Sequence, residues 1–75
     1  MVLDLITKQN DDGCTAEVPT VKGCESWAHT EDEAIDKTVS LLRYYLKLSD
    51  TLEIKIDKAR GNKKQSVYKL VFNKP

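Results

Sequence analysis

The stretch His29-Thr30-Glu31-Asp32-Glu33-Ala34 decides the fold, because it opens the one long helix that the sequence predicts. Thr30 and Glu33 form a capping box, in which the Thr30 hydroxyl accepts from the Glu33 N–H and the Glu33 carboxylate accepts from the Thr30 N–H. The three acids of the first turn also oppose the positive end of the helix dipole. We therefore expect a helix running to about Leu48, with Lys47 in its last turn.

Apolar residues recur every three or four positions along this helix, which is the period of one buried face. The central stripe consists of Ile35, Val39, Leu42 and Leu46, and it is widened by Ala34, Leu41, Tyr45 and Leu48. A stripe of this width requires a sheet beneath it. The opposite side of the helix mixes acidic and basic residues, as expected for a solvated face and not for a membrane-surface helix.

Period-two alternation elsewhere predicts five strands, at residues 2–9, 14–18, 24–29, 51–58 and 66–73. Turn residues at 10–13 and 20–23 separate the first three strands, and a basic loop at 59–65 separates the last two. In the fourth strand, Leu52, Ile54 and Ile56 are expected on a buried face.

The predicted fold is α+β, in the order β-β-β-α-β-β, with one mixed or antiparallel sheet, a single helix on one face, and residues 1–75 forming one domain. The economical topology is a three-stranded meander with the fourth strand returned beside the first. The other face of the sheet is left to water or to a partner. Val2, Ile6 or Val71 on that face would indicate that something covers it.

Composition bounds the protein class. The chain has 75 residues, a size at which oligomerisation often supports a small core, so we expect a homo-oligomer, most simply a dimer. No stretch approaches the roughly 18 apolar residues of a membrane span, and the start has no signal-peptide pattern. We expect a cytoplasmic protein without membrane contact.

Charge is unevenly distributed along the chain, although the net charge is zero. Residues 1–50 hold ten acids and five Lys or Arg, whereas residues 51–75 hold two acids and seven bases. Such an imbalance allows the two charge sets to occupy opposite surfaces.

Cys14 and Cys24 are the only cysteines, and without an export signal they are expected to be buried thiols and not a disulfide. Together with His29 they match no zinc spacing, and no fourth ligand is evident. We therefore expect no metal site and no cofactor.

Two stretches, DGCTAEVPTVKGC at residues 12–24 and TEDEAI at residues 30–35, resemble the N-terminal domain of the HicB antitoxins and their stand-alone relatives. The resemblance covers about residues 10–48. Residues at the spacing of the family are Pro19, Gly23, Cys24, Thr30, Glu33 and Ala34. The chain departs from the family pattern with Cys14 for an aromatic, Lys22 for Pro, and Ala28-His29 for Gly-Asp.

The resemblance implies a partial ribonuclease-H-like fold and an antitoxin-type function. It implies binding to a small basic RNA-cleaving toxin whose active surface is covered. Full-length family members carry a further DNA-binding unit, which has no counterpart after the last predicted strand, so no sequence-specific DNA binding is expected from this chain.

Acidic residues of the first half are the candidate partner-binding residues, because they would complement a basic RNA-binding protein and speed its association. With Trp27, they are Asp11, Asp12, Glu17, Glu25, Glu31 and Asp32. An ordinary solvated face is the alternative for the acids. For Trp27 the alternatives are packing under the helix start and contact with a partner.

A second hypothesis is nucleic-acid binding through the basic hairpin near Tyr68. Its candidates are Lys58, Arg60, Lys63 and Lys64, with Lys55 and Lys69 beside them. A third hypothesis, an enzyme, is disfavoured. The strands carry too few acids for a metal-dependent nuclease site, and His29 has no evident nucleophile to serve, so no catalytic residue is assigned.

Overall fold

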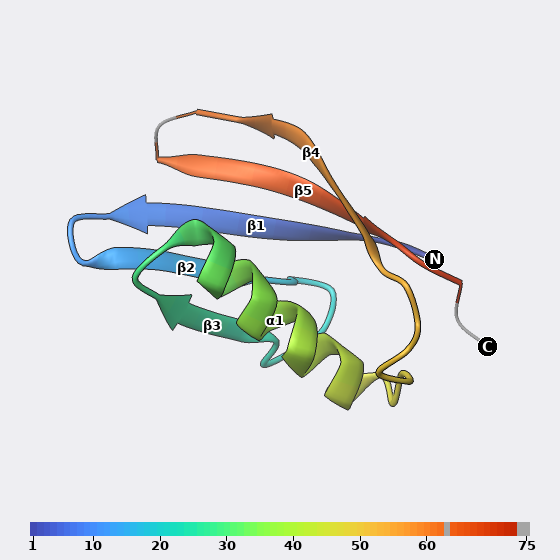
Figure 1. Ribbon diagram of the computed structural model, residues 1–75. Coiled ribbons are helices and arrows are strands. Elements are labelled where there is room, and N and C mark those ends of the chain that lie inside the picture. The colour runs from blue at the N-terminus through green and yellow to red at the C-terminus, as the bar shows by residue number, and fades with distance from the viewer. Residues whose placement is uncertain (63, 74–75) are drawn as a thin grey trace.

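The computed structural model describes residues 1–62 and 64–73, and it shows one sheet with a helix against one face (Figure 1). The elements are β1 (Val2–Asn10), β2 (Gly13–Glu17), β3 (Glu25–Ala28), α1 (Glu31–Tyr45), β4 (Lys55–Gly61) and β5 (Gln65–Val71). The predicted α+β class and the order β-β-β-α-β-β are therefore confirmed.

The strands lie in the order β3-β2-β1-β5-β4, and every neighbouring pair is antiparallel. The expectation that the fourth strand returns beside the first is wrong, because β5 takes that place. Leu70, fully buried in β5, explains the exchange: it pairs with Leu3 of β1 and needs a central position. The lysine- and arginine-bearing β4 is suited to the solvated edge.

The helix begins as predicted. Thr30 is extended at the N-cap, and its hydroxyl accepts from the Glu33 N–H at 3.2 Å. The reciprocal bond from the Thr30 N–H to the Glu33 carboxylate is not formed among the described residues. Half of the capping box is enough to satisfy one of the free N–H groups of the first turn.

The helix ends at Tyr45, three residues earlier than expected. Lys47 lies after the helix in the left-handed region, at φ +54°, so its predicted place in the last turn is wrong. The N–H of Leu48 donates to the Arg43 carbonyl at 2.8 Å and the N–H of Lys47 to the Tyr44 carbonyl, which is the Schellman pattern. Leu48 is buried because this reversal turns it back onto the core.

The core lies between α1 and the helix side of the sheet. The helix contributes the buried Ala34, Ile35, Thr38, Val39 and Leu42. From the sheet side come Leu5, Cys14, Ala16, Ala28 and Leu70, with Val18, Cys24 and Phe72 beside them. The alternation expected for the second strand, with Cys14, Ala16 and Val18 directed inward, is confirmed by this burial.

The fourth strand differs most from its prediction. β4 begins at Lys55 and runs to Gly61, into the expected loop, and all seven of its residues are exposed. Leu52 and Ile54 are partly buried but precede the strand, while Ile56 is 39% exposed. The expected buried face is therefore wrong, because α1 lies over β1, β2 and β3 and does not extend across the sheet to β4 (Figure 1).

Candidate protein-binding surfaces

A polar cluster joins the helix start to the two central strands. The Thr7 hydroxyl of β1 donates to Oε2 of Glu31, and the Tyr68 hydroxyl of β5 donates to Oε1, both at 2.8 Å. Thr7 is fully buried. Both carboxylate oxygens of Glu31, a predicted partner-binding residue, are therefore engaged inside the molecule.

The environment of this cluster keeps its phenol and its nearest thiol protonated. Burial raises the pKa of Tyr68 to about 12, and the hydrogen bond to Glu31 and the charges of Glu31 and Asp32 act in the same direction. Burial, followed by the charge of Glu31, also raises the pKa of the Cys14 thiol. The cluster thus places two neutral hydroxyl donors, of Thr7 and Tyr68, around the carboxyl group of Glu31.

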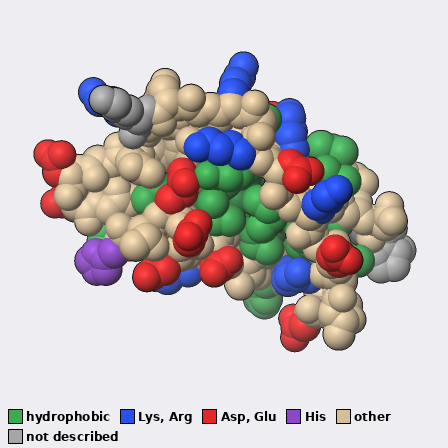
Figure 2. Space-filling view, turned by 45° about the horizontal axis from the view of Figure 1, so that its top comes forward, with side chains coloured by type: hydrophobic (Ala, Val, Ile, Leu, Met, Phe, Trp, Pro, Cys, Tyr) green, Lys and Arg blue, Asp and Glu red, His purple; other side chains and the backbone are tan. Residues whose placement is uncertain are grey.

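The helix side of the β4–β5 hairpin is an apolar surface that α1 leaves open. It consists of Ile56, Tyr68 and the adjoining Leu3 of β1, and we call these residues the inner strip. Lys58, paired with Tyr68, borders the strip on the β4 side. Figure 2 shows hydrophobic side chains at the centre of this face, with acidic and basic side chains around them.

The turn between β1 and β2 and the start of α1 line one shallow hollow, and Asp11, Asp12 and Glu31 are among its residues. The turn is held in shape because the N–H groups of Asp12 and Gly13 both donate to the Asn10 side chain at 3.1 Å. Asp32 follows in the first helical turn. The three acids without the internal bonds of Glu31, namely Asp11, Asp12 and Asp32, are called the acidic end.

The remaining predicted partner-binding residues lie elsewhere. Glu17, Glu25 and Trp27 alternate with buried residues of β2 and β3, so they project from the sheet face opposite α1, which we call the outer face. The predicted acidic set is therefore divided between the two sides of the sheet.

Trp27 does not pack under the helix start, so that expectation is wrong. Its ring lies over Gly13, where an added Cβ would be 2.7 Å from the indole Cζ2, and it meets the His29 ring edge-on at 4.8 Å. The side chain remains 43% exposed. An aromatic residue covering a cross-strand glycine stabilises strand pairing, which explains why the ring turned outward.

The basic residues do not form one surface. Lys58 shares the helix side with Tyr68, whereas Arg60 lines a hollow on the outer face with Val67. Lys64 is exposed at the hairpin tip, and its carbonyl accepts from the Gln9 N–H at 2.7 Å. Lys63 lies outside the described residues.

The uneven charge along the sequence allowed the acidic and basic residues to lie on opposite surfaces. The structure does not separate them in this way. The hairpin tip, the β1–β2 turn and the helix start lie at the same end of the molecule (Figure 1). Acids and bases are therefore neighbours there, which weakens the basic field that a nucleic acid would meet.

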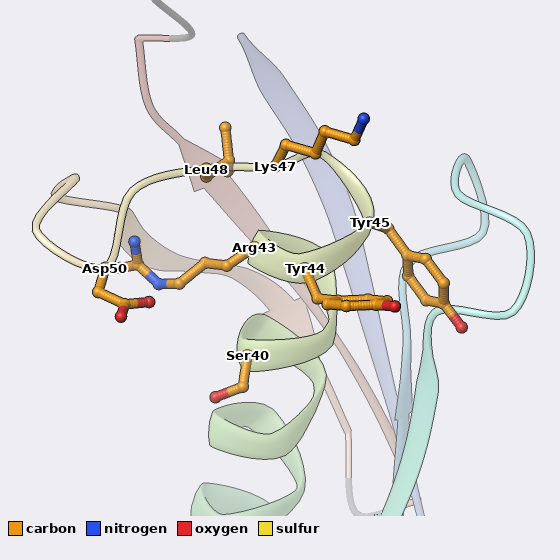
Figure 3. Close-up of a pocket in the computed structure, with 7 residues that line it drawn as sticks. All are labelled: Ser40, Arg43, Tyr44, Tyr45, Lys47, Leu48 and Asp50. Carbon is orange, nitrogen blue, oxygen red and sulfur yellow. The ribbon is translucent and has the colours of Figure 1, made fainter.

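Another hollow, which the sequence did not predict, lies at the C-terminal end of α1 (Figure 3). It is lined by Ser40, Arg43, Tyr44, Tyr45, Lys47, Leu48 and Asp50. Arg43 donates to the Ser49 carbonyl at 2.8 Å, and Tyr45, directed at the β2–β3 loop, donates to the Gly23 carbonyl at 3.5 Å. These hydrogen bonds stabilise the chain reversal after the helix. The consecutive tyrosines Tyr44 and Tyr45 were the sequence feature from which this hollow could have been predicted.

Cys14 and Cys24 are both free and buried, as expected. In the described part of the chain, no three His, Cys, Asp or Glu side chains come close enough together to hold a metal ion. None of the helical structure described reaches the length and apolar character of a membrane span.

The fold and these surfaces define an α+β protein with one helix on an antiparallel sheet and exposed apolar areas on both sides of that sheet. No family model, curated protein or solved structure matches the chain. The resemblance to the HicB antitoxins therefore rests on the residues quoted above.

Proposed function

We propose that this protein is a protein-binding module of the HicB antitoxin type, which neutralises a small basic RNA-cleaving toxin by covering the toxin's active surface. The inner strip carries the proposal, because Ile56 is 39% exposed and the half-buried Tyr68 lies beside it in an area bordered by charges. Apolar centres with polar rims are the usual anatomy of protein interfaces. The proposal describes a binding function and assigns no catalytic residue.

The acidic end supports the choice of a basic partner. A toxin that cleaves RNA must hold phosphates and therefore carries cations, and Asp11, Asp12 and Asp32 would attract them. Because such a toxin acts on cellular RNA, the proposal requires the cytoplasm. The resemblance of residues 10–48 to the antitoxins supplies the class of partner.

The test uses the product of the reading frame next to this gene. We expect that product to arrest growth when expressed alone, and coexpression of this chain to restore growth through a complex that survives size-exclusion chromatography. Ile56→Asp should abolish the rescue, whereas Tyr44→Asp, at a helix residue that is 77% exposed, should retain it. The proposal would be contradicted if the neighbouring gene product did not arrest growth, or if the Ile56→Asp variant still formed the complex.

The contribution of the acidic end is measured separately by association kinetics. Asp11→Asn with Asp12→Asn should slow association with the toxin about tenfold at low salt, because electrostatic steering is lost. The matched control, Asp50→Asn with Glu53→Gln, removes the same charge elsewhere and should leave the rate nearly unchanged. A gel shift with RNA at low salt tests the nucleic-acid alternative, which no specific feature of the fold favours.

A further inference from the structure

The outer face of the sheet carries an apolar band, although no described element covers it. Val2 and Val71 are cross-strand partners in β1 and β5, and they are 59% and 38% exposed. Ile6 and Val67 form the next apolar pair on this face. Asp4 and Lys69 lie between the two pairs and form a salt bridge. The middle of the outer face therefore consists of two apolar pairs with one salt bridge between them.

The margins of the same face carry opposite charges. Glu17 and Glu25 are direct partners across β2 and β3, and like charges placed opposite one another destabilise a strand pair. Neither has a cation within salt-bridge distance among the described residues. The register aligns Glu25, Glu17, Ile6, Val67 and Arg60 in one row across the sheet. The row thus runs from two acids through two apolar residues to a base.

This row is self-complementary because β1 is the middle strand of the five. A two-fold axis parallel to β1, between two facing sheets, places the β3 margin of one copy over the β4 margin of the other. Glu25 of each copy then faces Arg60 of the second copy, with Glu17 one strand further in over Val67, and the apolar bands meet along β1, where Ile6 faces its own counterpart. We propose that the outer face is the interface of a symmetric homodimer with aligned sheet-on-sheet packing.

The size of the face suits this occupant. The five strands hold 32 residues. At about 4.8 Å between strands and about 3.3 Å per residue, they cover roughly 500 Å² per copy, or about 1,000 Å² for the pair. Specific interfaces need about 1,000 Å² in total. A second copy therefore covers enough of the face for a stable dimer.

Pairing of two copies through sheet edges is the less favourable arrangement. The β4 edge carries Lys55, Lys58 and Arg60 and an irregular register at Lys58/Arg60, both of which oppose strand addition. The β3 edge has only four residues. Neither edge offers a long, flat template for a neighbouring strand.

The dimer is tested on the full purified chain by sedimentation equilibrium. We expect a species of twice the 8.5 kDa chain mass, and Val71→Asp should raise the dimer dissociation constant at least about tenfold. Val71 is already 38% exposed in one copy, so circular dichroism should show an unchanged fold. Tyr44→Asp is the control for an added charge away from the interface and should leave the dimer intact.

A charge-swap experiment tests the geometry itself. Glu17→Lys with Glu25→Lys in one chain, and Arg60→Glu in another, should each weaken self-association. Mixing the two variants should restore dimers, because the lysine at position 25 of the first chain, with the lysine at position 17 beside it, then meets Glu at position 60 in the second. A monomer at all concentrations, or a dimer indifferent to these reversals, would overturn the proposal. None of these residues belongs to the inner strip, so the toxin test is decided independently.

Discussion

Glu31 joins α1, β1 and β5 through a single carboxylate, because Thr7 and Tyr68 each donate to one of its oxygens. Hydrogen bonds to a charged acceptor are stronger than neutral ones, and Thr7 is fully buried, so leaving it unpaired would be costly. A residue chosen from the sequence for its charge is thus engaged in holding the helix start on the sheet.

Removing the Tyr68 hydroxyl tests this role. Tyr68→Phe should lower the free energy of unfolding by about 1 kcal/mol at pH 7, because Glu31 loses one donor. The pKa of Tyr68, about 12 when folded and near 10 when unfolded, makes deprotonation easier in the unfolded chain. The contribution of Tyr68 to the free energy of unfolding should therefore be fully present below pH 10 and be lost between pH 10 and 12. Over this range the unmodified protein should lose more stability than the Tyr68→Phe variant. Urea unfolding at a series of pH values measures the difference.

Two glutamine variants separate the charge of Glu31 from the general charge of the helix start. Glu31→Gln should lower the pKa of Tyr68, since both its hydrogen bond and its charge raise that pKa. Glu33→Gln removes a charge from the same turn without touching the phenol. Absorbance titration of the tyrosines distinguishes them, and equal effects of the two variants would disprove the specific contact.

At the level of elements, the short strand β3 is held by contacts on both sides of the sheet. Ala28 faces the core, and Trp27 covers Gly13 on the outer face. A Cβ at position 13 would approach the Ala28 carbonyl oxygen to 2.5 Å, so the backbones of β2 and β3 meet where only glycine fits.

Gly13→Ala should therefore destabilise the protein by about 1 to 3 kcal/mol, because the β2–β3 pair must separate to admit the methyl group. Thr15→Ala, in the same strand but without such crowding, serves as the control and should cost less. Chemical denaturation of both variants gives the comparison, and a Gly13→Ala protein as stable as the original would refute the close approach.

The uneven cover provided by α1 leads to a second prediction at this level. Leu70→Ala should cost about 2 to 5 kcal/mol, because it opens a cavity in the core. Ile56→Ala should cost less than about 1 kcal/mol, since Ile56 is already 39% exposed. Thermal unfolding distinguishes the two variants. If both variants lost the same free energy of unfolding, the helix side of β4 would have to be buried, which would contradict the exposure of Ile56.

For the whole molecule, the decisive contact is between the two ends of the described chain. β1 pairs with β5, and the amino group of Met1 donates to the Phe72 carbonyl at 2.6 Å. The sheet cannot be completed until the last strand is added beside the first. Both thiols lie in the core that this closure seals, so their reactivity should report unfolding of the whole protein.

Cys14 and Cys24 should resist alkylation by iodoacetamide at pH 8 in the folded protein, because both are buried and burial raises the pKa of each thiol. Addition of urea should expose both together. Mass spectrometry of labelled protein measures the rates. Rapid labelling of one cysteine in the absence of urea would reveal local opening and contradict a single cooperative unit.

The sequence alone determined the helix start, the inward face of the second strand, and the α+β class. Each depends on residues close together in the chain: Thr30 needs only Glu33, and period-two alternation describes one strand at a time. The division of the candidate acids was not predictable in this way, because Glu17 and Glu31 separate only when the sheet has a helix side and an outer side.

Tertiary structure alone decided which strand lies beside β1, that β4 is exposed, and that Trp27 turns outward over Gly13. The physical reason is competition between strands for the inner positions of one five-stranded sheet. Ile56 and Leu70 have equally clear alternation in their strands, but only one of these two strands could lie beside β1. Leu70 is fully buried there, and Ile56 remains on the open edge.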